Sequence, residues 1–223
     1  MNLADKIKSC CLGTEFEYQC HFHNLYRLIR NNLANFAPEN MLDVGCADGK
    51  RSIEVADIFH LRPESVYGID CNPYLIGVCA GRFHATVVDL ELGSILIDDD
   101  GFSLVICNQV LEHLKNYAKL LDELIRVTKK GGYILIGIPN LAHLINRIYL
   151  LFGIQPMCIA LDGPHVRSFT HRNFVKMLSS LPRVKLIDYE GSLMYPLPFF
   201  LGRLLARRCV GLSGYVCYLL QKK

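Results

Sequence analysis

Hydrophobic residues along this chain recur with two periods, one typical of helices and the other of strands. Apolar side chains follow the spacing of one helix face within residues 16–36, 117–127 and 170–181. Short apolar runs, typical of buried strands, lie between these stretches. The expected strands cover residues 41–45, 66–70, 85–89, 102–107, 133–138, 184–189 and 214–220.

Repeated strand, helix, strand units predict an α/β fold with a parallel sheet covered by helices on both faces. Open sheets of this kind bind ligands at the carboxyl ends of their strands, near the point where the strand order reverses. With 223 residues we expect one domain. Its expected parts are an N-terminal helical cap (1–40), a ligand-binding core (41–140) and two insert segments (141–170 and 191–212).

Glycine and proline residues set the expected ends of two helices. Residues 129–132, Lys-Lys-Gly-Gly, are expected to end the helix over 117–127 before the fifth strand. Pro196 and Pro198 limit any helix in the second insert segment to the residues that follow them.

Composition narrows the class of protein. No apolar stretch of about 18 residues is free of charge, and the N-terminus lacks the pattern of a cleaved signal peptide. We therefore expect a cytoplasmic protein. The formal net charge of +3 is too small to indicate a nucleic-acid partner. The sequence leaves the oligomeric state open.

The ten cysteines do not suggest disulfides or a metal site. They are scattered, and several lie in or beside the expected strands, as reduced core residues do: Cys46, Cys71, Cys107 and Cys217. Cys20-His21-x-His23 lies on a helical stretch, where adjacent side chains point apart. No bound metal is expected.

The strongest motif is the run from Asp43 to Gly49, Asp-Val-Gly-Cys-Ala-Asp-Gly, which joins the first strand to a helix. Small residues at such a turn let the backbone approach a ligand closely. A dinucleotide fingerprint would need glycine at positions 45, 47 and 50, but Ala47 and Lys50 stand at two of them. The motif therefore counts against a nicotinamide cofactor.

This motif resembles the first motif of the class I S-adenosylmethionine-dependent methyltransferases, acid-x-Gly-x-Gly-x-Gly, with Ala47 in place of the middle glycine. The resemblance runs through five ordered motifs from about residue 40 to 140. It implies a Rossmann-like methyltransferase fold, with a seven-stranded mostly parallel sheet, an antiparallel last strand and helices on both faces. It also implies S-adenosylmethionine as the cofactor.

The same resemblance assigns cofactor contacts at the strand ends. Asp70 would hold both ribose hydroxyls, because a carboxylate can accept from two O–H donors. Asp89 would meet the adenine amine, with Leu90 as an apolar wall, and Asn108 would face the methionine end. The expected cofactor-binding set is Asp43, Gly45, Cys46, Ala47, Gly49, Asp70, Cys71, Asp89, Leu90, Asn108 and Val110.

Two histidines are candidate catalytic residues. Methyl transfer requires alignment and exclusion of water, and a base only where the nucleophile must lose a proton. Residues 109–114 resemble the segment after the fourth strand in small-molecule and quinone-type methyltransferases, which makes His113 a candidate base. Alternatively, Glu112 and His113 start the following helix and hold the turn.

Residues 164–170 match a His-x-Arg-x-Phe-Thr pattern seen in many relatives. In this segment His165 or Arg167 could meet the substrate. Alternatively, Thr170 simply caps the next helix while Arg167 pairs with an acid.

The acceptor is less defined than the cofactor. Residues 141–161 and 192–212 are apolar and fall where this family builds its substrate lid, although ordinary core helices have the same composition. Residues 191–223 hold five cations and no acid, which suggests contact with an anionic surface. The expected acceptor is a small molecule or a lipid-like one, and peripheral membrane contact is the accompanying expectation. The candidate cations on the insert are Arg203, Arg207 and Arg208. A methyltransferase-like protein that binds its cofactor or a partner without turnover is the alternative function.

Overall fold

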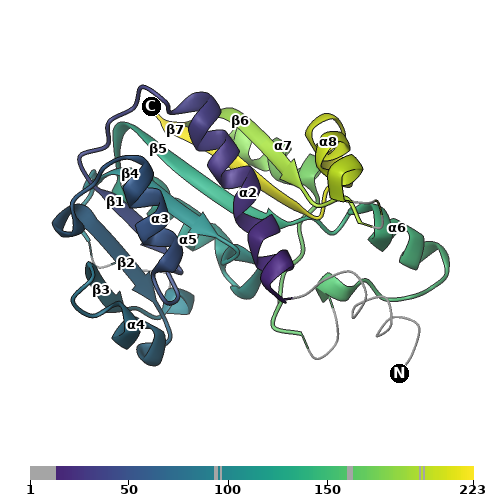
Figure 1. Cartoon of the computed structure of the whole chain (residues 1–223), viewed down its shortest axis with the longest axis horizontal. Coiled ribbons are helices and arrows are strands. Elements are labelled where there is room, and N and C mark those ends of the chain that lie inside the picture. Colours follow the sequence, from purple (N-terminus) through teal and green to yellow (C-terminus); the bar gives the residue numbers. More distant parts are fainter. Residues whose placement is uncertain (1–13, 93–94, 96, 160–162, 196, 198) are drawn as a thin grey trace.

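The computed structural model describes residues 14–223 apart from 93–94, 96, 160–162, 196 and 198. Seven strands form one sheet in the order β3-β2-β1-β4-β5-β7-β6 (Figure 1). The strands are β1 (Met41–Val44), β2 (Val66–Asp70), β3 (His84–Val87), β4 (Phe102–Asn108), β5 (Thr128–Pro139), β6 (Val184–Ser192) and β7 (Tyr215–Lys222).

Strand direction follows the expected pattern. Strands β1 to β5 pair in parallel, and β7 runs antiparallel to both of its neighbours, β5 and β6. The strand order reverses between β1 and β4, which places the expected ligand edge at the carboxyl ends of these two strands. The predicted seven-stranded Rossmann-like fold with an antiparallel last strand is confirmed.

Seven helices surround the sheet in the described part of the chain. They are α2 (Thr14–Asn32), α3 (Lys50–Ile58), α4 (Pro73–Cys79), α5 (Tyr117–Val127), α6 (Leu144–Leu151), α7 (His171–Ser180) and α8 (Phe199–Arg208). Short 3-10 turns occur at η1 (Pro63–Ser65), η2 (Leu90–Leu92), η3 (Leu111–His113), η4 (Met157–Ile159) and η5 (Val210–Leu212). None of these helices combines the length and apolar character that a bilayer crossing demands.

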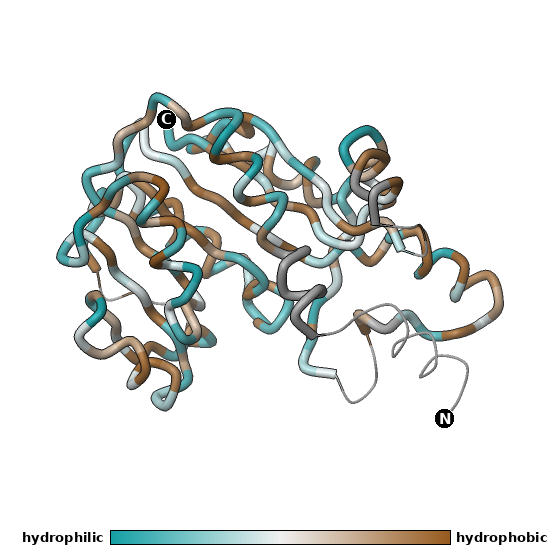
Figure 2. The backbone as a smooth tube through the Cα atoms, viewed as in Figure 1, coloured by the Kyte–Doolittle hydropathy of each residue, from teal (hydrophilic) through white to brown (hydrophobic). Residues whose placement is uncertain are grey.

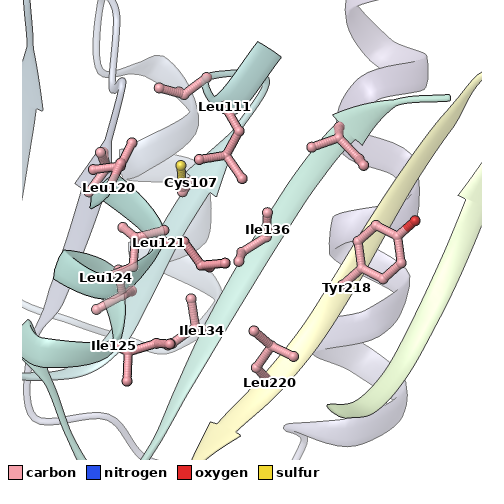
Figure 3. Packing of buried hydrophobic residues seen from close by; sticks show 14 of the residues in the cluster. Cys107, Leu111, Leu120, Leu121, Leu124, Ile125, Ile134, Ile136, Tyr218 and Leu220 are labelled. Carbon is pink, nitrogen blue, oxygen red and sulfur yellow. The ribbon is translucent and has the colours of Figure 1, made fainter. Parts of the chain in front are cut away.

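Side chains alternate across the sheet and create two hydrophobic clusters, one on each face. Along β4, Val105 and Cys107 face α5 and α7, whereas Leu104 and Ile106 face α2 and α3. Figure 3 shows the first cluster, in which leucines of α5 lie beside β4 and β5 and the cluster continues across the sheet to Tyr218 and Leu220 of β7. Tyr218 in the middle of β7 is fully buried there. Both faces are therefore covered, as the long apolar strands predict.

Element boundaries differ from the sequence prediction in a few places. Helix α5 ends at Val127 as expected, but β5 begins at once with Thr128, so residues 129–132 lie in the strand, with Gly131 at a φ of 78°. Helix α8 begins at Phe199, as the two preceding prolines require. Of the apolar and cationic residues expected on its surface, the side chains of Phe199, Phe200 and Arg203 lie outside the described residues.

Asn140 fastens the end of β5 to the segments that follow it. Its side-chain nitrogen donates to the carbonyls of Gly211 (3.0 Å) and Ser213 (2.8 Å). Its side-chain oxygen accepts from the backbone N–H groups of Ala142 (3.1 Å) and His171 (3.2 Å). One buried amide thereby joins the starts of both α6 and α7 to the turn that precedes β7.

Candidate active site

The loop after β1 adopts a conformation that favours glycine at two positions. Gly45 and Gly49 have φ values of 80° and 72°. A Cβ at Gly45 would lie 2.3 Å from a methyl carbon of Val110, and one at Gly49 would lie 2.5 Å from the ring of Phe83. Ala47 also takes a positive φ of 49°, which is uncommon for a residue other than glycine and matches its place at the middle glycine of the motif.

Asp70 at the end of β2 holds this loop in place. Its Oδ2 accepts from the backbone N–H of Ala47 at 3.0 Å, and its Oδ1 accepts from Asn72 at 2.9 Å. Each carboxylate oxygen has a second lone pair, so the group can accept further hydrogen bonds from a ligand. Because both oxygens are already anchored, the carboxylate is oriented before any ligand arrives.

Asp43, at the other end of the motif, lies inside the protein. Its Oδ2 accepts from the Ser52 hydroxyl at 2.6 Å, which links β1 to α3. Burial raises the pKa of Asp43 to about 6, although the hydrogen bond from Ser52 opposes this shift. The Asp43 carboxyl group therefore supports the loop after β1, although burial makes its charged form less favourable.

A cavity of about 470 Å³ lies at the carboxyl ends of β1, β2 and β4. Ten of the eleven residues predicted to bind the cofactor line it: Asp43, Gly45, Cys46, Ala47, Asp70, Cys71, Asp89, Leu90, Asn108 and Val110. Gly49, which precedes α3, does not line the cavity. It packs instead against Phe83 and Cys79. The structure thus brings residues from four separate segments around one space.

The Asn108 side chain is the clearest polar group without a protein partner in this cavity. Both its amide nitrogen and its amide oxygen are buried and form no hydrogen bond. The side chain occupies the space above Gly137 of β5, where an added Cβ would lie 1.7 Å from its Oδ1. An orphaned buried amide that lines a cavity is a ready partner for a polar ligand.

The sequence pattern missed several lining residues, namely Phe22, Arg51, Glu91, Gln109 and Leu114. Arg51 lies 4.7 Å from the centre of the Phe22 ring, so α2 and α3 meet at the cavity wall. Gln109, Glu91 and Leu114 each directly follow a predicted site residue, and this position could have indicated their place. Phe22 of α2 and Arg51 of α3 reach the site because these two helices pack together there. The hydrophobic periodicity of the sequence does not specify that packing.

His113 and His165 come together although they are distant in the sequence. Their ring centres lie 4.8 Å apart in an edge-on arrangement. His113 lines the cavity, whereas His165 is not among its lining residues. Burial lowers the pKa of His113, and the nearby His165 adds to that effect. His113 is therefore predominantly neutral near pH 7, the form in which an imidazole can accept a proton.

Glu112 and His113 do not start α5. They lie in the separate turn η3, and α5 begins at Tyr117. The Glu112 carbonyl accepts from the backbone N–H groups of Val166 (2.9 Å) and Arg167 (3.0 Å), which fixes residues 164–167 beside this turn. The Glu112 side chain is fully buried, and this burial raises its pKa to about 8.

The remaining polar residues of the 164–170 segment have structural partners. Arg167 donates from Nε (3.2 Å) and from its terminal nitrogen (2.9 Å) to the carbonyl of Lys115, so it bonds to a backbone oxygen and not to the acid that the alternative expected. The Thr170 hydroxyl accepts from Asn173 at the start of α7, as a cap does. The capping interpretation of Thr170 is confirmed.

Comparison with known proteins identifies the family of this chain. The sequence model of the family described as "Methyltransferase domain" matches residues 18–181. The chain is similar to ajmaline N-methyltransferase of Rauvolfia serpentina, with 31% identity over 106 residues that cover 44% of this chain and 35% of that protein. It is also similar to the ubiquinone biosynthesis O-methyltransferase of Pseudomonas syringae pv. tomato, with 29% identity over 113 residues, 48% of this chain and 47% of the relative. The chain thus spans between a third and a half of these relatives.

Among solved structures, the fold is similar to that of a SAM-dependent methyltransferase from Archaeoglobus fulgidus. The TM-score is 0.60 at 19% sequence identity, and the match covers 95% of this chain and 100% of the other. This neighbour supports the fold, while the family match supports the expected cofactor, S-adenosylmethionine.

Proposed function

Because this chain belongs to the methyltransferase-domain family, we propose that it transfers a methyl group from S-adenosylmethionine to a small, lipid-like acceptor at a membrane surface. The observation that carries the proposal is the cavity at the strand-reversal edge. There the anchored Asp70 carboxylate and the unpartnered Asn108 amide line the same space. The two curated relatives are also named for small-molecule methylation.

The lining residues fit the cofactor in chemistry. Asp70 would accept from the ribose hydroxyls, and Asn108 would bind the methionine end. Asp89 and Leu90 would hold the adenine. The bound cofactor supplies a methyl group on a positively charged sulfur, and the chain's task is to align the acceptor and exclude water.

His113 is the proposed base for an acceptor that must lose a proton. Its Nδ1 lies 3.2 Å from the Pro164 carbonyl, which can only accept, so Nδ1 carries the ring proton. Nε2 is then the nitrogen that can take a proton from the acceptor. His165, at 4.8 Å between ring centres, would orient His113.

Exposed apolar side chains at one end of the molecule support a lipid-like acceptor. Around the end of α6, Leu151 and Phe152 are 83% and 76% exposed. Figure 2 shows this apolar end, and Figure 1 places α6 and α8 at the same end of the sheet. The other exposed apolar residues of this region are Leu150, Ile154, Leu201, Leu204 and Leu205. Patches of this kind mark interaction surfaces.

Charge favours an anionic membrane as the partner of this apolar end. Arg207 and Arg208 are exposed in the last turn of α8. No acidic residue occurs in residues 141–161 or 191–223. An apolar face flanked by cations fits acyl chains and anionic headgroups together.

The membrane part of the proposal is tested by co-sedimentation with vesicles of neutral lipid containing phosphatidylglycerol. Replacing Arg203, Arg207 and Arg208 with Glu should abolish sedimentation without changing the affinity for S-adenosylhomocysteine. A matched variant, Arg30→Glu with Arg62→Glu, changes exposed cations elsewhere and should sediment like the wild type. Equal sedimentation of all three proteins, or none for any, would leave only the core-packing account of α8.

The catalytic part is tested with S-adenosylmethionine that carries an isotopically labelled methyl group. The protein is incubated with a total lipid extract and a polar metabolite extract, and label transfer is followed by mass spectrometry. Label in a lipid fraction, lost with Asp70→Ala, is the expected result. Tight binding of S-adenosylhomocysteine with no transfer to either extract would favour a binding protein without turnover.

A further inference from the structure

Glu112, His113 and His165 form a compact group beside the cofactor cavity. Each offers one ligand atom, and these atoms all lie within 4.8 Å of one another. The first two residues come from η3, and the third comes from the segment after α6 that the Glu112 carbonyl fixes in place. The backbone thus holds the three side chains together across a long stretch of sequence.

Both imidazoles are oriented in the same way. The Nδ1 atom of His113 lies 3.2 Å from the Pro164 carbonyl, and that of His165 lies 2.9 Å from the Cys158 carbonyl. A carbonyl only accepts, so each Nδ1 carries the proton of the neutral ring and each Nε2 keeps a free lone pair. A histidine that donates its other N–H to a backbone carbonyl is the usual arrangement of a metal ligand.

The buried Glu112 carboxyl group is a second observation that points to a bound ion, independent of the two histidines. The residue is 0% exposed, and neither carboxyl oxygen has a hydrogen-bond partner. Burying such a group without a partner costs several kcal/mol in typical proteins, so buried carboxyl groups are normally paired or bound to a metal. Within the described residues no cation lies close enough to form an ion pair with it.

We propose that Glu112, His113 and His165 bind a divalent transition-metal ion of the Zn²⁺ class. Two imidazole nitrogens and one carboxylate oxygen are a donor set that such ions favour over Mg²⁺ or Ca²⁺. The ligand atoms of a tetrahedral site lie roughly 3.3 Å apart, so atoms that all lie within 4.8 Å of one another would approach by at most about 1.5 Å on binding. No metal is expected from the sequence alone, because His165 is far from Glu112 and His113 along the chain and only the fold brings the three together.

Three protein ligands leave a coordination position for solvent or for an acceptor atom. An ion on Nε2 of His113 occupies the lone pair that a base needs, so with the ion bound the metal, and not His113, would make the acceptor easier to deprotonate. His113 lines the cofactor cavity, so an ion held there would lie near the acceptor. This consequence rests on the proposed methyl transfer and narrows the acceptor to molecules with an oxygen or nitrogen that binds a metal. The metal site itself does not depend on methyl transfer.

The test titrates Zn²⁺ and Co²⁺ into chelator-treated full-length protein. Calorimetry measures Zn²⁺ binding, and visible absorption reports the coordination of Co²⁺. We expect one ion per chain, with affinity reduced by more than about 100-fold in Glu112→Gln and in His165→Asn, since removing a supporting partner alone costs about 10–100-fold. His171→Asn, which changes a half-buried histidine outside the group, should bind like the wild type.

Thermal unfolding separates loss of the site from loss of the fold. Zn²⁺ should raise the melting temperature of the wild type and of His171→Asn, but not that of the two site variants. Absence of binding to the wild type, or unchanged binding in both site variants, would overturn the proposal. Metal binding without methyl transfer would contradict only the proposed function, whereas transfer by a protein that binds no metal would contradict only this inference.

Discussion

Removal of the Asp70 carboxylate is the most direct perturbation of the cofactor site. In the folded chain this group accepts from Ala47 at 3.0 Å and from Asn72 at 2.9 Å, which leaves one lone pair on each oxygen for the ribose hydroxyls. Asp70→Ala removes both contacts to the ligand and both anchors of the loop. Asp70→Asn keeps the shape but directs an NH₂ group at one of two N–H donors.

The expected magnitude follows from these contacts. A hydrogen bond to a charged group contributes about 1.5–3 kcal/mol net. Asp70 is half-buried, so water can bond to the ribose hydroxyls in place of the missing carboxylate. The total loss of binding free energy should therefore remain near the value of one such hydrogen bond. Both variants should therefore bind S-adenosylhomocysteine about 10- to 150-fold more weakly.

Calorimetric titration with S-adenosylhomocysteine measures this loss, and thermal unfolding without ligand checks that each variant folds. Asp48→Ala is the matched control, because it removes a carboxylate of the same loop that does not line the cavity. Asp48→Ala should change the affinity for S-adenosylhomocysteine by less than about 2-fold, because a single exposed charge contributes little free energy. An Asp70→Ala protein that binds like the wild type, or tight NAD binding by the wild type, would refute the assignment.

Three further predictions follow from buried contacts. Gly137→Ala should weaken S-adenosylhomocysteine binding by about 10-fold or more in calorimetry, because the added Cβ would displace the Asn108 side chain. Burial raises the pKa of Asp43 to about 6, against about 3.9 when unfolded, so the folded state binds the proton more tightly. The Asp43 contribution to the free energy of unfolding should then fall by about 2 kcal/mol between pH 4 and pH 6, and Asp43→Asn should reduce the total change over this range by that amount in urea titrations. Glu190→Ala should cost about 3–5 kcal/mol in the same assay, because it leaves Arg27, 2.6 Å away, buried without its carboxylate.

Each of these has a clear contrary outcome. Normal binding by Gly137→Ala would mean that Asn108 does not contact the cofactor. An equal pH slope in Asp43→Asn would assign the slope to another carboxyl group. If the double variant Arg27→Leu with Glu190→Leu were as unstable as Glu190→Ala, the cost would come from lost packing and not from an unpaired charge.

The sequence predicted best those features that depend on local periodicity. The bounds of α5, Tyr117–Val127, and of β2, Val66–Asp70, agree with the predicted ones to the residue. Both elements show strong hydrophobic patterns that are ended by residues with other preferences. The order of the motifs then predicted most of the residues that line the cavity, since parallel strands place their carboxyl ends along one edge of the sheet.

Contacts between neighbouring segments were beyond that reasoning. Gly137 matters because Asn108 of the adjacent strand folds over it, and nothing near Gly137 in the sequence reports this. The Glu112 carboxyl group comes near the distant His165 only because the 164–167 segment is bound to η3. Strand β5 starts at Thr128 because β4 offers a pairing partner, at Phe102, despite the turn-like glycines that follow.

The amide of Asn140 bears on how an acceptor enters and leaves. Its four side-chain hydrogen bonds, to Gly211, Ser213, Ala142 and His171, connect the roots of both insert segments. A hinge at the end of β5 would break all four together, whereas bending at the far ends of α6 and α8 would break none. Any opening and closing of the site should therefore be confined to the outer, apolar tips of the inserts, which are the surface proposed to contact a membrane.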